Sequence, residues 1–117
     1  MSFDEPVTFI KDRVSYVTGT KAFENLSKEG EGQEMYKNGT IYRGHFLDNM
    51  RHGIGEAIGS NNGNWYSGQW YKGSREGYGR AVYNSKDKYE GNWKNDMRSG
   101  FGKFTESRQR TVARGHG

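Results

Sequence analysis

The sequence of 117 residues contains no cysteine, a single proline and no long apolar run. The lack of cysteine excludes thiolate nucleophiles, thiolate metal ligands and a disulfide framework. An apolar fraction of 31% and a mean hydropathy of −1.12 exclude a membrane-spanning helix and leave little material for an ordinary two-layer core. The first residues lack the basic start and apolar stretch of a secretory signal, so we expect a cytoplasmic protein.

An excess of charge of one sign is also missing. The net charge is +4, and residues 42–106 carry ten basic and seven acidic side chains that interrupt one another. Nucleic-acid-binding proteins present a continuous basic patch, which this distribution lacks, so we expect no nucleic acid partner. Residues 107–117 hold three basic and no acidic residues and are predicted to form a basic tail.

Glycine and aromatic residues, in contrast, are abundant and recur in a fixed pattern. A tyrosine is followed at i+2 by glycine, at i+4 by phenylalanine or tryptophan, and then by a Gly-x-Gly sequence. The three copies start 24 and 23 residues apart, which is typical of a repeat architecture. Their rings are Tyr42, Phe46, Tyr66, Trp70, Tyr89 and Trp93, and their glycines are Gly44, Gly53, Gly55, Gly68, Gly77, Gly79, Gly91, Gly100 and Gly102.

A degenerate copy precedes these three. Phe23 stands one period before Phe46, and Gly30 and Gly32 stand one period before the next Gly-x-Gly, but the tyrosine and the first glycine are missing. Terminal repeats of stacked arrays are often atypical, so this copy is interpreted as a cap. The predicted organisation is a leader at 1–18, a capping repeat at 19–41, repeats at 42–65, 66–88 and 89–106, and the tail at 107–117.

Each copy is predicted to be a β-hairpin. Residues at i, i+2 and i+4 share one face of a strand, and turn-forming residues separate the aromatic residue from the Gly-x-Gly. The fold class is therefore all-β, an elongated single sheet of consecutive antiparallel hairpins. The glycines leave slots in which the rings lie, and we expect the six rings to form a trough that contacts a partner.

The opposite face of the predicted sheet is also partly apolar. Ile54, Tyr78 and Phe101 stand at the centre of Gly-x-Gly, and Trp65 shares their parity, as do Ile41, Leu47, Ile58, Tyr71 and Val82. An apolar face needs cover, either from residues 1–18 or from another chain. These residues are therefore further candidates for partner binding.

One basic position recurs in all four copies. Lys28, Arg51, Arg75 and Arg98 precede the Gly-x-Gly and are expected to line up as a basic row at one edge of the sheet. Such a basic row either prevents aggregation of sheet edges or contacts an acidic partner, meaning a protein or an acidic phospholipid.

Groups for catalysis are scarce. His45 and His52 flank one hairpin with Asp48 nearby, but exposed histidine on a strand is ordinary, and the serines have no recurrent histidine and carboxylate partners. The glycine pairs precede strand-like segments and not helices, which argues against phosphate binding. We expect no enzyme, no cofactor and no metal.

The repeated segments resemble a known family. YRGHF with GIG, YSGQW with GYG and YEGNW with GFG are similar to MORN repeats (membrane occupation and recognition nexus), closely over residues 42–106 and loosely over 19–41. The resemblance implies an open β-array that binds other subunits of a multiprotein complex, as in the radial spokes of the ciliary axoneme or in cytoskeletal scaffolds. It also implies two alternatives, binding of acidic phospholipids and a homodimer formed through repeat faces or ends.

Overall fold

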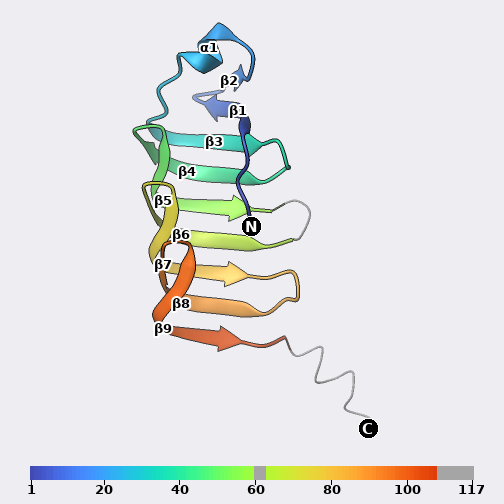
Figure 1. Ribbon diagram of the computed structural model, residues 1–117, viewed down its shortest axis with the longest axis vertical. Coiled ribbons are helices and arrows are strands. Elements are labelled where there is room, and N and C mark those ends of the chain that lie inside the picture. The colour runs from blue at the N-terminus through green and yellow to red at the C-terminus, as the bar shows by residue number, and fades with distance from the viewer. Residues whose placement is uncertain (60–62, 108–117) are drawn as a thin grey trace.

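In the computed structural model, residues 1–59 and 63–107 are described, and they form one antiparallel sheet. The predicted tail from residue 108 on lies outside the described residues. The strands follow in the order β2-β1-β3-β4-β5-β6-β7-β8-β9 (Figure 1). The elements are β1 (Pro6–Lys11), β2 (Val14–Val17), α1 (Lys21–Glu24), β3 (Gly30–Tyr36), β4 (Ile41–Leu47), β5 (Met50–Ile58), β6 (Trp65–Tyr71), β7 (Ser74–Val82), β8 (Lys88–Lys94) and β9 (Met97–Thr105). The predicted all-β hairpin array is confirmed.

Each of the three full repeats forms one hairpin with a two-residue turn. The turns connect β4 to β5, β6 to β7 and β8 to β9. Both turn residues have positive φ angles, for example 51° at Asp48 and 66° at Asn49. Two-residue turns of this kind match the right-handed twist of the strands they join.

A bulge bends every hairpin beside its Gly-x-Gly sequence. Gly44 pairs with Gly55 but Phe46 pairs with Arg51, so three residues of β5 face one residue of β4. The same register shift occurs between β6 and β7 and between β8 and β9. Gly53 lies in the first bulge with φ of 83°, a conformation that favours glycine. The turn ends of the hairpins therefore curl out of the sheet plane, as the loops at the left of Figure 1 show.

The bend brings each hairpin turn against the preceding repeat. The backbone N–H of Gly73 donates to the carbonyl of Arg51 at 2.8 Å, and that of Asp96 donates to Arg75 at 3.2 Å. Asn49 makes the equivalent bond to Lys28 at 3.1 Å. The repeats are thus joined by these turns as well as by strand pairing.

The N-terminal part of the sheet differs from the prediction. Within the expected capping repeat, residues 21–24 form a short helix and not a strand. The strand that pairs with β3 on the side away from β4 is β1, which comes from the leader. The physical reason is that the degenerate copy lacks the tyrosine whose ring fills the equivalent glycine slot in the full repeats. Gly32 leaves a slot that Phe9 of β1 fills, since a Cβ on Gly32 would lie 2.5 Å from the Phe9 ring. Phe23 lies half-buried at the margin of the core.

Residues 1–5 cross the face of the sheet that carries the repeat rings. Phe3 packs edge-to-face on Tyr36 and Trp70, with centroids 5.1 and 5.9 Å apart. Thr40 donates its hydroxyl to the Ser2 carbonyl at 3.0 Å. The expectation that residues 1–18 cover the opposite face is therefore wrong, because this segment covers the ring face and extends the sheet edge.

Candidate functional site

The six repeat rings form a continuous ladder along one face. Successive contacts are edge-to-face, with centroids 5.1 Å apart for Tyr42–Trp70 and for Tyr66–Trp93, and 5.2 Å for Tyr66–Trp70. None of the six rings is more than 6% exposed. The structure thus differs from the predicted open trough, because these rings are the core and offer no surface to a partner.

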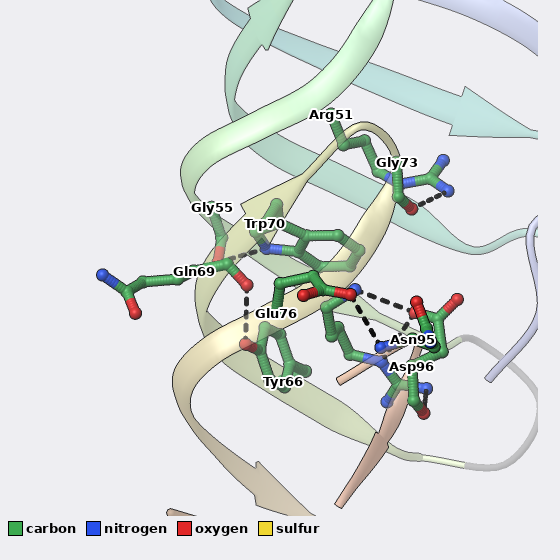
Figure 2. Close-up of polar contacts among 10 residues, drawn as sticks. Arg51, Gly55, Tyr66, Gln69, Trp70, Gly73, Glu76, Asn95 and Asp96 are labelled. Carbon is green, nitrogen blue, oxygen red and sulfur yellow. Dashed lines mark hydrogen bonds and ion pairs between the residues drawn. The ribbon is translucent and has the colours of Figure 1, made fainter. Parts of the chain in front are cut away.

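The polar atoms of the ladder are bonded within the chain. The indole N–H of Trp70 donates to the Gly55 carbonyl at 3.0 Å, and that of Trp93 donates to Gly79 at 3.1 Å. The Tyr66 hydroxyl donates to the Gln69 carbonyl at 2.9 Å, as Figure 2 shows. Each tryptophan thereby connects its repeat to the glycine pair of the preceding one.

Burial of the tyrosines predicts a loss of stability at alkaline pH. Desolvation raises the pKa of Tyr66 to about 12, opposed in part by Arg75, and desolvation also raises the pKa values of Tyr36 and Tyr42. In the unfolded chain these hydroxyls titrate near pH 10. We therefore expect tyrosine ionisation to leave the free energy of unfolding unchanged below about pH 10 and to lower it as the pH rises from there toward about 12.

Urea unfolding at about pH 9, 10 and 11 tests this expectation. Tyr66→Phe removes one titrating group and should reduce the slope of stability against pH above about pH 10. An unchanged slope in this variant would show that the buried Tyr66 hydroxyl does not couple ionisation to folding.

The repeat glycines provide the space for the rings. A Cβ on Gly55, Gly79 or Gly102 would lie 2.1 to 2.2 Å from a tyrosine hydroxyl oxygen. Gly44, Gly68 and Gly91 instead face the backbone of the paired glycine, with a Cβ placed 2.4 to 2.5 Å from its Cα. Gly53, Gly77 and Gly100 have positive φ angles in the bulges. A side chain at the first six positions would displace a ring or a strand, and one at the last three would strain the backbone.

The basic row lies on top of the ring ladder. Arg51 places its guanidinium 3.8 Å from the Phe3 centroid and donates to the Tyr36 hydroxyl and the Gly73 carbonyl. Arg75 lies 4.8 Å from the Trp93 centroid and forms an ion pair with Asp96.

The two ends of the row differ in exposure. Lys28 forms an ion pair with Glu34, and its ammonium lies 5.7 Å from the Phe9 centroid. Arg98 is exposed and lies over Tyr89 and Phe104. Lys28, Arg51 and Arg75 are therefore neither free edge charges nor an open contact for an acidic partner, contrary to both predicted interpretations.

None of the segments at 1–59 and 63–107 covers the opposite face. Ile54 is 59% exposed, Tyr78 is 52% exposed and Phe101 is 89% exposed. Trp65 is half-buried, with its indole N–H donating to Glu56 at 2.7 Å. Strand pairing brings further apolar residues into one row across β3 to β7, namely Met35, Ile41, Ile58, Trp65 and Val82. Of the predicted partner-binding residues, those of this face are the ones at the surface.

Sequence reasoning missed the side chains that hold the turns. Glu29, His52 and Glu76 occupy equivalent positions, and each accepts a backbone N–H from the next turn, at Asp48, Lys72 and Asn95 respectively. Figure 2 shows the last of these bonds. The recurrence of an acceptor just before each Gly-x-Gly was the available signal.

Two histidines considered for metal binding have other contacts. His45 pairs with Glu31 at 2.7 Å, and the His52 ring is tilted against the Tyr71 ring with its centroid 5.2 Å away. Residues 1–59 and 63–107 contain no cluster of three His, Cys, Asp or Glu side chains suited to a metal ion. No helix in this part of the chain is long and apolar enough to cross a bilayer.

These features define a β-hairpin repeat array with one self-closed face and one open face. The family model for the MORN repeat matches residues 42–64, 66–88 and 89–105, which is more than half of the sequence. The chain therefore belongs to the MORN repeat family, whose repeats are general binding motifs for proteins or membranes. A comparison with curated proteins gives no match.

Proposed function

We propose that this chain is a non-enzymatic, cytoplasmic scaffold subunit that binds other proteins through its open face. One observation carries the proposal: the ring face is closed by contacts within the chain, while the opposite face leaves large apolar side chains exposed. Contiguous exposed apolar surface is typical of protein interaction sites. The resemblance to radial-spoke and cytoskeletal arrays supports a place in the ciliary axoneme or the cytoskeleton.

The lipid alternative has less support from the geometry. Binding of acidic headgroups would need free cations at the surface. Lys28 and Arg75 each have an internal carboxylate partner, and Arg51 donates to Tyr36 and Gly73. Three of the four members of the basic row therefore favour a structural role, only Arg98 being exposed, and a protein partner remains the proposal.

Fractionation of cells that express the chain tests this function. We expect wild-type protein to remain with the insoluble axonemal or cytoskeletal fraction in high salt, and Tyr78→Glu to release it, because a charge would be buried in the contact. Ser15→Asp is the control, since Ser15 is exposed on the edge strand β2, away from β7. Release of wild-type protein by salt, with flotation on vesicles containing phosphoinositides, would favour the lipid alternative instead.

A further inference from the structure

The open face carries a regular strip of apolar residues where the hairpins bend. Ile54, Tyr78 and Phe101 occupy equivalent positions beside the bulges of β5, β7 and β9, and we call them the elbow strip. All three are more than half exposed. Successive members lie two strands apart, which corresponds to about 9.6 Å.

A hollow lies beside the first residue of the strip. A cavity of about 620 Å³ is lined by Ile54, Tyr71, Trp70 and the side-chain-free Gly53 and Gly77, among others. Trp70 lies opposite Gly53 in the sheet, and Trp93 lies opposite Gly77 one hairpin further on. The hollow therefore offers space for a partner side chain beside Ile54, and Gln69, whose side-chain oxygen accepts the backbone N–H of Tyr78 at 2.6 Å, adds a polar group to it.

Building on the proposed function, we infer that the elbow strip binds an amphipathic α-helix of a partner protein, lying along the array and across its strands. Residues seven apart on a helix are separated by about 10.5 Å along its axis. A tilt of about 24° reduces this to the 9.6 Å spacing of the strip, and the twist of the sheet favours such a tilt.

The backbone also favours a helix over an extended segment. β5 and β7 are interior strands, so no free strand edge lies at Ile54 or Tyr78, although both residues fall in bulges where pairing with the preceding strand is interrupted. Phe101 lies on β9, the last strand of the described sheet. An extended chain laid across this apolar strip would leave its own N–H and C=O groups unpaired, whereas a helix bonds them internally. The face therefore fits a partner segment whose backbone groups are already hydrogen-bonded to one another.

Charge on the two sides of the strip defines the polar flanks of this helix. On one side the charges pair with each other, Arg43 with Glu56 at 3.8 Å and Arg80 with Glu90 at 3.3 Å. On the side of the turns, Lys72 is exposed, with its ammonium 5.4 Å from the Tyr71 centroid, and Lys94 is exposed as well. The helix should therefore carry Asp or Glu on the flank that faces these lysines.

The test uses a designed 21-residue helical peptide with leucine repeating every seven residues and glutamate on one flank. Fluorescence anisotropy with the full chain should show saturable one-to-one binding, and circular dichroism should show a gain of helix in the peptide. A peptide of the same composition, with its leucines moved out of the seven-residue repeat, should bind at least tenfold more weakly. Equal binding of both peptides would overturn the inference.

Variants of the chain locate the contact. Tyr78→Glu should weaken binding at least tenfold, and Ser15→Asp should leave it unchanged, with both variants melting as the wild type does because Tyr78 and Ser15 are exposed and lie outside the core. If neither peptide binds but fractionation still depends on Tyr78, the proposed function stands and the helix is wrong. A free chain that sediments as a dimer, dissociated by Tyr78→Glu, would place a second copy on the strip and likewise overturn the helix.

Discussion

Replacing Gly79 with alanine is expected to destabilise the protein by about 3 kcal/mol, the upper part of the range for overpacking in a core. The added Cβ would lie 2.2 Å from the Tyr66 hydroxyl oxygen and 2.4 Å from its ring. The ring cannot withdraw, because it lies between Trp70 and Trp93, with its centroid 5.2 and 5.1 Å from theirs. Urea unfolding followed by tryptophan fluorescence measures the loss.

Two variants identify the cause of this loss. Ser67→Ala, on the open face of the neighbouring strand, should change stability by less than about 0.5 kcal/mol. Tyr66→Ala removes the ring that the new Cβ would strike, so Gly79→Ala should cost less in that background than in the wild type. Full additivity of the two changes would contradict the assignment of Gly79 to the ring slot.

Much of the fold could be predicted from the sequence because its signals are local. Tyr42, Gly44 and Phe46 specify one face of a strand, and the turn residues that follow specify the hairpin. Both signals lie within one period, so each copy independently predicts the same unit. Stacking these units into a single sheet then follows from the need of each hairpin to bury its rings.

The N-terminal edge could not be predicted because its pairing is non-local. Phe9 lies outside the repeat, and nothing in its immediate surroundings indicates that it fills the slot above Gly32. Phe23 stands at the correct distance from Phe46, yet its segment forms a helix. The slot that a tyrosine fills in the full repeats is filled at Gly32 by a ring from outside the repeat, and a period in the sequence does not report such tertiary packing.

The role of the ring face was mistaken for a similar reason. A flat sheet would leave the rings of one face available to a partner. The bulges at Gly53 and its equivalents bend the hairpins, and the turns then bring Arg51 and Arg75 over the rings. Side chains that look like a surface charge row in a flat arrangement thus become the cover of the core. The exposed apolar side chains lie on the opposite face, where the parity of Ile54 and Tyr78 was predicted correctly.

Replacing Trp70 with alanine is expected to cost about 4 kcal/mol, within the range for truncation of a large buried aromatic side chain. Trp70 contacts the rings of Tyr42, Tyr66 and Phe3, and its indole N–H is bonded to the Gly55 carbonyl. It therefore joins two repeats and the N-terminal segment. Thermal unfolding should show a lower melting temperature and a broader transition, because the coupling between neighbouring repeats is weakened.

Phe23→Ala provides the comparison, since Phe23 is half-buried beside a four-residue helix at the margin of the sheet. We expect its cost to be about 1 kcal/mol, with an unchanged transition width. Trp70→Phe retains a ring but removes the indole N–H and part of the buried ring, so its smaller loss combines the bond to Gly55 with lost packing. If Trp70→Ala and Phe23→Ala lowered stability equally, the ring ladder would not be what couples the repeats, and strand pairing alone would have to hold the array together.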